Sequence, residues 1–405
     1  MSSGRIAITG VGLITAVGST RESTWSSLVD GRCGIGDVTL FDTAGYRSRC
    51  GAEIESFDVS GLSRYERRRW SRSDQLAVVA AGEALEDAGL RGNVVDPTRI
   101  GVLLGAGTGD LLRNEDYYFT MLDRGIGRAP PTRIHNHFTS SPTDVVATRF
   151  GFEGLRTTVV SACSSSSIAI GYAGDLIRAG RLDAAVCGGS DALSRLTFSG
   201  FNALRLMDPA PCRPFDASRA GMSIGEGAGI LVLEDWERAR RRGASIYAEL
   251  AGYALTCEAF HATAPEPEGH AIADTIRQAL ATSSTAADDV DHVNAHGTAT
   301  PQNDRAEARG LHHVFGERAR RLPVTSIKSM VGHCLGAAGA VEAAVAALTV
   351  ARGVIPPTIN HTQTDGDCAV EIVANTARDM PLRCVVSTSL AFGGNDAAIV
   401  LRSIE

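Results

Sequence analysis

The chain has 405 residues, enough to bury a large core in two domains or two fused halves. A composition of 44% hydrophobic and 21% charged residues, with 44 glycines, is typical of an ordered globular protein and excludes a disordered one. The net charge of −7 argues against general nucleic-acid binding, and nine cysteines without a CxxC pair suggest single thiols in a reducing, cytoplasmic compartment.

The N-terminal segment is expected to form a strand. Residues 6–17 are apolar but are broken by Gly10 and Gly12, which predicts a first strand and loop instead of a signal peptide. Thr15 stands where a dinucleotide-binding fingerprint needs its third glycine, so a cofactor loop is not expected here. An early helix is predicted over residues 23–29.

The densest basic cluster of the chain covers residues 64–72 and precedes an amphipathic helix predicted over 73–88. Its arginines are Arg64, Arg67, Arg68, Arg69 and Arg72. By default such a run is the solvated start of a helix. The alternative is a docking patch for an acidic partner, and the residues alone leave both interpretations open.

Cys163 lies where a buried strand is predicted to pass into a helix. Val159 and Val160 are typical of the end of a strand, and helical spacing follows the polar turn as far as Gly180. The unpaired N–H groups and the positive dipole end at the start of a helix favour a thiolate there. A small buried cysteine is the alternative, and the rest of the chain has to decide.

The pattern restarts near residue 245. A strand at 247–254, a helix at 269–281, strands at 290–295 and 324–328, and a Gly/Ala-rich helix at 332–351 repeat the order seen around Cys163. We interpret this as an internal duplication of βαβ units, with halves over 1–245 and 246–405. Alternating strands and helices predict an α/β fold with a mainly parallel sheet in each half, covered on both faces.

Residues 331–348 are apolar enough to raise the question of a membrane span. His333 and Glu342 lie within this window, which is otherwise built largely of Gly and Ala, so a buried core helix is favoured. Packing the two halves together would place Cys163 and the turn at 328–333 face to face.

Three further segments carry unusual chemistry. His296 ends a strand, Lys328 and His333 lie in one turn, and residues 392–394 (Phe-Gly-Gly) form a turn rich in exposed backbone. A thiolate with nearby imidazoles and free backbone N–H groups suits acyl transfer through a thioester. A zinc site is the competing interpretation, and it is weak because the histidines are far apart in the sequence without a close Cys or His pair.

These segments resemble the elongating β-ketoacyl-acyl carrier protein synthases of the thiolase superfamily, among them the ketosynthases of type II polyketide or polyene pathways. The matching segments are 161–165, 296–304, 328–339 and 392–394, in the family's order and spread over nearly the whole chain. The resemblance implies the thiolase fold, with two related halves in five αβαβα layers, and usually a dimer. It also implies substrates carried on the phosphopantetheine arm of an acyl carrier protein, no metal or redox cofactor, and a docking role for the arginine cluster.

The implied reaction is a decarboxylative Claisen condensation of malonyl-acyl carrier protein with a cysteine-bound acyl chain, giving a 3-oxoacyl product two carbons longer. Cys163 would carry the acyl chain, and the N–H groups of Cys163 and Phe392 would form the oxyanion hole. Neutral His296 and His333 would stabilise the enolate. Lys328 would keep the site positive and orient His333 or its water.

The resemblance also implies residues for substrate binding. Thr298 and Thr300 would bond the pantetheine arm, and Gly393 and Gly394 would shape the turn beside the substrate. Glu342 is interpreted as structural and is assigned no chemical step.

Three rival classes can be weighed. A thiolase needs a second cysteine in the C-terminal turn, and a chain-initiating synthase pairs one histidine with an asparagine; neither pattern is present. A chain-length-determining partner subunit lacks the nucleophile that Cys163 provides, although this chain could pair with such a subunit in a heterodimer instead of forming a homodimer. Asn395 and Asp396 stand where the family more often has Thr-Asn, which leaves the acyl length and unsaturation open.

Overall fold

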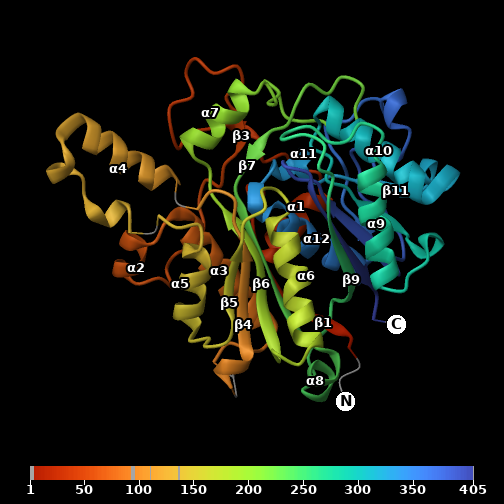
Figure 1. Cartoon of the computed structure of the whole chain (residues 1–405), viewed down its shortest axis with the longest axis horizontal. Coiled ribbons are helices and arrows are strands. Elements are labelled where there is room, and N and C mark those ends of the chain that lie inside the picture. Colours follow the sequence, from red (N-terminus) through yellow and green to blue (C-terminus); the bar gives the residue numbers. More distant parts are fainter. Residues whose placement is uncertain (1–3, 93–95, 110, 136, 405) are drawn as a thin grey trace.

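A mixed sheet of 11 strands runs through the molecule in the order β13-β11-β10-β15-β16-β9-β1-β8-β6-β4-β5. The computed structural model describes residues 4–92, 96–109, 111–135 and 137–404 (Figure 1). The strands of this sheet are β1 (Ile6–Ile14), β4 (Ile100–Gly105), β5 (Arg156–Val159), β6 (Ala184–Asp191), β8 (Gly227–Asp235), β9 (Ala248–Cys257), β10 (His292–Asn294), β11 (Pro323–Thr325), β13 (Glu371–Ile372), β15 (Cys384–Ser389) and β16 (Asn395–Arg402).

The α-helices surround and separate the two parts of this sheet. They are α1 (Arg21–Val29), α2 (Arg64–Arg69), α3 (Arg72–Asp87), α4 (Leu111–Arg124), α5 (Ser141–Phe150), α6 (Ser165–Arg178), α7 (Arg195–Ala203), α8 (Trp236–Arg241), α9 (His270–Thr282), α10 (Pro301–Phe315), α11 (Lys328–Val331) and α12 (Ala338–Arg352). Two small sheets add β2 (Gly36–Asp37), β3 (Cys50–Ala52) and β7 (Ile224–Gly225), and β12 (Val354–Ile355) with β14 (Arg378–Asp379).

The strand order shows the internal duplication that the sequence predicts. Strands β5-β4-β6-β8-β1 of the N-terminal half recur as β11-β10-β15-β16-β9 in the C-terminal half. In both halves the first three strands are parallel and the last two are antiparallel to their neighbours. The halves join where β1 pairs with β9.

The prediction of a mainly parallel sheet in each half is therefore wrong in part. The short turn between β15 and β16 cannot make the long crossover that parallel strands need, so these two strands are antiparallel. Strands β6 and β8 of the other half are also antiparallel, although a long connection with α7 and β7 joins them. The parallel strands that recur in the two halves are therefore β5, β4 and β6 on one side and β11, β10 and β15 on the other.

Five layers result from this arrangement (Figure 1). Helices α6 and α12 contact each other and strands of both halves, and so form the middle layer. On the outside, α3 and α5 cover the N-terminal half, whereas α9 and α10 cover the C-terminal half. Helix α6 follows β5 after the turn that carries Cys163, and α12 follows β11 after the short helix α11 and a turn.

Helix α12 is a core helix, as its sequence predicts. Residues Leu335–Arg352 are apolar and long enough to cross a membrane, but 89% of this window is buried inside the protein. Small residues bring α12 against the sheet: a Cβ on Gly229 of β8 would lie 2.5 Å from backbone atoms of Ala340 and Val341. The turn before α12 is thereby held at the centre of the molecule.

Candidate active site

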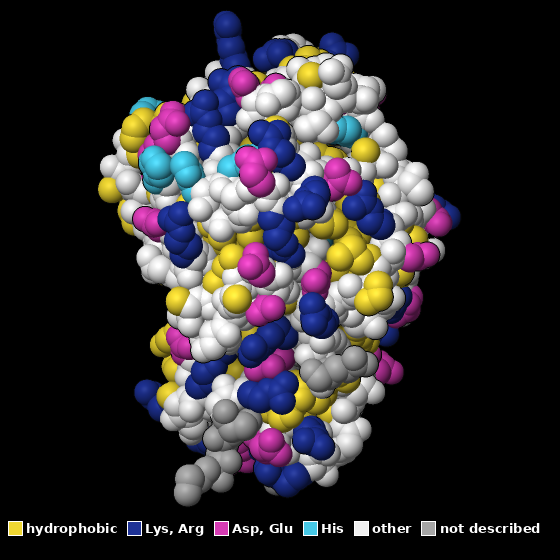
Figure 2. All heavy atoms as spheres, turned by 90° about the vertical axis from the view of Figure 1, so that its right-hand side faces the viewer, with side chains coloured by type: hydrophobic (Ala, Val, Ile, Leu, Met, Phe, Trp, Pro, Cys, Tyr) yellow, Lys and Arg dark blue, Asp and Glu magenta, His cyan; other side chains and the backbone are white. Residues whose placement is uncertain are grey.

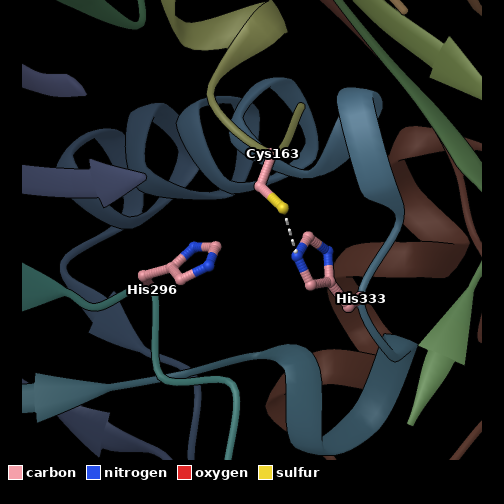
Figure 3. Close-up of side chains that lie close together, drawn as sticks. All are labelled: Cys163, His296 and His333. Atoms are coloured by element: carbon pink, nitrogen blue, oxygen red, sulfur yellow. Dashed lines mark hydrogen bonds between the residues drawn. The ribbon is translucent and has the colours of Figure 1, made fainter. Parts of the chain in front are cut away.

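Cys163 sits in a tight turn between β5 and α6, one residue before the N-cap residue Ser164. The preceding residue, Ala162, has φ of 46°, a left-handed conformation that is strained for a residue with a side chain. Two hydrogen bonds of the Ser165 hydroxyl fix the turn: it accepts from the Ser161 N–H at 2.8 Å and donates to the Ala162 carbonyl at 2.7 Å. This turn directs the sulfur toward the C-terminal half (Figure 3).

Two imidazoles from the C-terminal half face this sulfur (Figure 3). The Nε2 atom of His333 lies 3.0 Å from Sγ of Cys163. The ring of His296 is nearly perpendicular to that of His333, with centroids 5.2 Å apart. Sγ and one nitrogen of each ring lie within 4.8 Å of one another, and all three side chains are buried. The fold thus brings together the three side chains that sequence analysis picked out from distant segments.

Hydrogen bonds on the far side of each ring fix where its proton lies. The backbone N–H of Leu335 donates to Nδ1 of His333 at 3.1 Å, so a neutral ring carries its proton on Nε2, beside the sulfur. The Lys328 ammonium lies 3.2 Å from Nδ1 of His296, and an ammonium can only donate. His296 therefore also holds its proton on Nε2. Each neutral ring presents one N–H donor on its pocket side.

Burial and a nearby positive charge keep both rings neutral. Burial lowers the pKa of His296 well below its usual value, with further lowering by Lys328 and His333. Burial and Lys328 lower the pKa of His333 in the same way. An uncharged imidazole with Nε2–H is a hydrogen-bond donor that does not release its proton to substrate.

The Cys163 thiol experiences opposing effects. Burial raises its pKa to about 11, whereas the charge of Lys328 and the backbone N–H of Phe392 lower it. The start of α6 was expected to favour a thiolate, and burial opposes it. Ionisation of the sulfur therefore relies on several groups together: the helix start, Lys328, the Phe392 N–H and the Nε2–H of His333.

Lys328 lies beneath His296 and is only 1% exposed. Its Nζ donates to the carbonyl of His296 at 2.6 Å and forms a buried ion pair with Glu342 of α12. Lys328 was predicted to orient His333 or its water. Its hydrogen bonds go instead to His296 and Glu342, because β11 pairs with β10 and brings Lys328 close to the loop that carries His296. Glu342, which sequence analysis assigned no step, is the counter-charge of this lysine.

Glu307 of α10 was missed by sequence analysis. Its carboxylate accepts hydrogen bonds from the backbone N–H groups of His296 and Gly297, both at 2.8 Å, and from the Thr388 hydroxyl at 2.7 Å. Glu307 is fully buried and so holds the loop that carries His296. A glutamate between two alanines, on the inner side of a helix just after a candidate histidine, was the available signal.

The turn of Phe392 lines the pocket that contains Cys163 and both histidines. Its backbone N–H approaches the sulfur of Cys163. Gly393 and Gly394 have φ of 82° and 73°, which explains the two glycines. The Phe392 ring lies against Phe201 of α7, with centroids 5.8 Å apart.

Thr298 and Thr300 line the same pocket as Cys163, both histidines and Phe392. Their hydroxyl oxygens are 2.9 Å apart. This places both hydroxyls on the wall of the pocket that leads to the sulfur.

The three central groups do not suit a metal ion. A metal bound through Nε2 of His333 requires the proton to move to Nδ1, but Nδ1 accepts the N–H of Leu335. For His296 the same shift would point a proton at the Lys328 ammonium. The donor set therefore favours two N–H donors over two metal ligands.

The arginine cluster divides in two. Arg64, Arg67 and Arg68 are exposed on α2 and Arg69 is half-buried. Arg72 differs: it donates to both carboxylate oxygens of buried Glu226, at 2.8 and 2.6 Å. Its inclusion among the docking residues is therefore wrong, since its charge neutralises a carboxylate of the core.

Family models match most of the chain: the Beta-ketoacyl synthase N-terminal domain over residues 3–239, and the C-terminal domain over residues 247–362. The chain belongs to the β-ketoacyl synthase family. It is 38% identical to 3-oxoacyl-[acyl-carrier-protein] synthase 2 of Synechocystis sp., over 99% of this chain and 98% of the relative. It is 40% identical to the tetracenomycin polyketide synthase ketoacyl synthase alpha subunit of Streptomyces glaucescens, over 98% and 96%.

Solved structures agree with this assignment. The structure titled "The ishigamide ketosynthase/chain length factor" has a TM-score of 0.94 and 35% identity to this β-ketoacyl synthase, and covers 99% of both chains. A β-ketoacyl synthase from Burkholderia phymatum has a TM-score of 0.92 at 31% identity. The predicted family, thiolase-type fold and acyltransferase activity of the elongating class are confirmed.

Proposed function

We propose that this β-ketoacyl synthase condenses a malonyl unit with an acyl chain held on Cys163, with loss of carbon dioxide. The observation that carries the proposal is one nucleophilic sulfur within reach of two neutral imidazoles that both offer Nε2–H. Loss of carbon dioxide drives the reaction, and no metal or redox cofactor is assigned a step.

The first step transfers the acyl chain to the enzyme. Sγ of Cys163 attacks the thioester carbonyl of the acyl carrier, the thiol proton passes to the departing pantetheine sulfur, and a new thioester forms. The N–H groups of Cys163 and Phe392 stabilise the oxyanion of the tetrahedral intermediate. Loss of one such donor typically costs about 100- to 1000-fold in rate.

The second step forms the carbon–carbon bond. The malonyl thioester carbonyl accepts hydrogen bonds from Nε2–H of His296 and His333, so the bond to the carboxylate can break with its electrons held as an enolate. The enolate carbon attacks the acyl-cysteine carbonyl, and the sulfur leaves as the thiolate. The product is a 3-oxoacyl chain two carbons longer on the carrier, whose pantetheine arm Thr298 and Thr300 would bond.

We assign carrier docking to Arg64, Arg67, Arg68 and Arg69 of α2. Ser63 caps this helix, and its side chain and that of Glu66 form a capping box, so the basic side chains stand on a fixed support. The face formed by the C-terminal half carries basic and acidic side chains interspersed (Figure 2). One solved relative is titled as a type II polyketide acyl-carrier protein in complex with its ketosynthase.

Docking is tested by charge reversal. Arg67→Glu with Arg68→Glu should raise the apparent KM for the acyl carrier while leaving kcat little changed, because the α2 arginines attract an acidic carrier and do not touch the reacting atoms. Arg240→Glu with Arg241→Glu on α8 reverses the same charges at another exposed helix and serves as control. An unchanged KM in the α2 variant would contradict the assignment.

We further propose a second subunit of the same fold, either another copy or a chain-length-factor-like subunit. The titles of two solved relatives pair a ketosynthase with a chain length factor. In this chain β5 ends the sheet with β4 as its one described neighbour, and α4 stands out from the body (Figure 1).

We also propose that the protein is located in the cytoplasm. The boundary between its two halves is proposed to lie between residues 245 and 246, just before β9.

Acyl loading is the direct test of the proposed nucleophile. Incubation with an acyl-carrier thioester should add one acyl group to Cys163, detected by mass spectrometry of the intact protein and its peptides. Malonyl-carrier should then release a product two carbons longer. An adduct on another residue, or unchanged turnover in Cys163→Ala, would overturn the proposed function.

A further inference from the structure

Two acidic side chains meet behind the turn of Phe392. Asp396 is the second residue of β16 and is 1% exposed. Glu258 follows the end of β9, the strand paired with β16. Both residues line the pocket that contains Cys163. Neither carries a role in the condensation described above.

Hydrogen bonding leaves one oxygen of each carboxyl unused. The Asp396 carboxyl accepts the backbone N–H of Ala391, and Oε2 of Glu258 accepts the N–H of Glu266 at 2.8 Å. The other two oxygens, Oδ2 of Asp396 and Oε1 of Glu258, are buried and have no hydrogen-bond partner among the described residues. Buried acceptors without donors are rare, and one proton between these oxygens would satisfy both at once.

We propose that Asp396 and Glu258 share one proton at neutral pH, and that this hydrogen bond positions the Phe392 N–H against Cys163. Asp396 is then a positioning residue, since it acts through Ala391 and the turn of Phe392. The inference rests on the proposed function in one respect, the use of the Phe392 N–H as an oxyanion donor.

The surroundings of Asp396 favour its protonated form. Burial and the negative charge of Glu258 raise the pKa of Asp396 to about 8, and Glu307 of α10 raises it further, whereas the Ala391 N–H lowers it. The charges that act on Asp396 are therefore acidic. Two carboxylates side by side in a buried place do not both ionise readily.

Other titratable groups on the neighbouring elements are already engaged. Three ion pairs lie on these elements: Lys328 with Glu342 of α12, Arg277 with Asp274 on α9, and Arg178 with Asp175 on α6. The Nδ1 atom of His261 accepts the N–H groups of Thr263 and Ala264. The Glu266 carboxylate accepts the N–H groups of Glu268 and His270. Glu307, which also acts on Asp396, is itself held by the backbone N–H groups of His296 and Gly297.

Asp396 and Glu258 (the acid pair) are connected by hydrogen bonds to residues 392–394, the turn whose Phe392 N–H is the proposed oxyanion donor (the oxyanion turn). The Gly393 N–H donates to the Ala262 carbonyl at 2.9 Å, and the Glu258 N–H donates to the Gly394 carbonyl at 2.8 Å. The segment that carries Glu258 is therefore the one that anchors the turn. If Asp396 loses its proton, the two carboxylates repel and the anchor shifts, and the Phe392 N–H shifts with it. The expected consequence is a loss of activity above pH 8.

An asparagine at this position would behave differently. Its amide can accept the Ala391 N–H through oxygen and donate to Glu258 through nitrogen at every pH. The aspartate of this chain reproduces that pattern only while it is protonated. Asp396 thus makes the oxyanion turn sensitive to pH.

The test compares wild type with Asp396→Asn from pH 7 to pH 9. Infrared spectroscopy should show a protonated carboxylic acid in wild type that titrates near pH 8 and is missing from the variant. The ratio of the elongation rate of Asp396→Asn to that of wild type should rise about tenfold by pH 9, because only about a tenth of Asp396 stays protonated one unit above its pKa. Asp379→Asn, the same change at an exposed residue, should leave the ratio flat.

A second variant checks the shared proton itself. Glu258→Gln removes the negative neighbour, so the acid band of Asp396 should titrate at a lower pH than in wild type. Absence of a titrating band assigned to Asp396, or rate profiles of wild type and Asp396→Asn that coincide, would overturn the proposal. The infrared band reports on the proton whether or not the enzyme condenses, so failure here differs from failure of the proposed function.

Discussion

Lys328 and Glu342 form the buried ion pair beneath the two imidazoles. Burial raises the pKa of Glu342 to about 7 in spite of the lysine. Lys328→Met leaves this carboxylate without a partner, which should lower the free energy of unfolding by about 3–5 kcal/mol at pH 8. At pH 6 the loss should be smaller, because a lone Glu342 takes up a proton.

Urea denaturation of the two single variants and of Lys328→Met/Glu342→Leu measures this pair. The double variant should recover much of the loss, since no buried charge remains. If the double variant loses as much unfolding free energy as the two single variants added together, Lys328 and Glu342 do not stabilise the protein as a pair.

Both active-site histidines have a pKa well below the ordinary 6.5 in the folded protein. The unfolded chain therefore binds more protons than the folded protein below pH 6.5, so stability should fall as the pH drops through that value. Decarboxylation of malonyl-carrier, which needs neutral rings, should keep its rate between pH 8 and pH 6. A rate that falls with a midpoint near pH 6.5 would show that a ring becomes charged there.

Sequence analysis selected the three side chains that meet in the pocket, but it missed Glu307 and the contacts between supporting residues. Cys163, His296 and His333 stand out because each lies at a strand end or turn, where a polar side chain has a reason to be. The partner of Lys328 depends on which strands pair, and the Asp396–Glu258 contact depends on the register of β16 against β9. Neither the choice of paired strands nor their register can be predicted from the residues of one strand alone.

At the scale of elements, close packing of α12 on β8 holds the turn that carries His333. A Cβ on Gly229 would meet the backbone of α12 at 2.5 Å, so Gly229→Ala forces the helix and the strand apart. The expected cost is about 1–3 kcal/mol of unfolding free energy, as for other overpacked cores.

The same substitution in an open position is the matched control. Gly200 lies within α7 and a Cβ there meets nothing within 4 Å. Gly200→Ala should be neutral or stabilising by up to about 1 kcal/mol, because alanine favours helix. Equal melting temperatures for the two variants would contradict the packing argument.

Sequence analysis located helices best where the helical pattern of apolar residues continued over many residues. The helices expected at 73–88 and 269–281 correspond to α3 and α9 within one residue at each end, whereas the helix expected at 332–351 begins only at Ala338, as α12. The antiparallel strands were missed because strand direction follows from the path of the connections, and a short apolar run reads the same in either direction.

At the scale of the whole molecule, the exposed apolar side chains of α4 and the residues just after it predict assembly. Phe119, Leu122 and Ile126 are 57%, 78% and 73% exposed, and α4 stands out from the body of the molecule (Figure 1). Burying such groups against a second subunit is favourable by about 1.5–3 kcal/mol for each large side chain fully covered. Leu122→Asp should therefore shift the protein toward the monomer in light scattering coupled to gel filtration.

Leu255→Asp introduces the same change at an exposed leucine of β9, in the C-terminal half, and should leave the mass unchanged. A monomeric wild type would contradict the proposed second subunit. The duplication itself was visible in the sequence, because strand, small turn and Gly/Ala-rich helix recur in the same order. The face-to-face placement of Cys163 and the turn at 328–333 was also predicted, but the pairing of β1 with β9 was not, since these strands lie far apart in the sequence.

The measurement that tests the central claim most directly separates acyl loading from condensation. Wild type, His296→Ala and His333→Ala are each given acyl-carrier and then malonyl-carrier, and the mass of the protein and the product are followed in time. All three should carry the acyl group on Cys163, but only wild type should release the elongated product at full rate, with each variant slower by about 100-fold or more. Elongation at the wild-type rate in either variant would show that its imidazole does not stabilise the enolate.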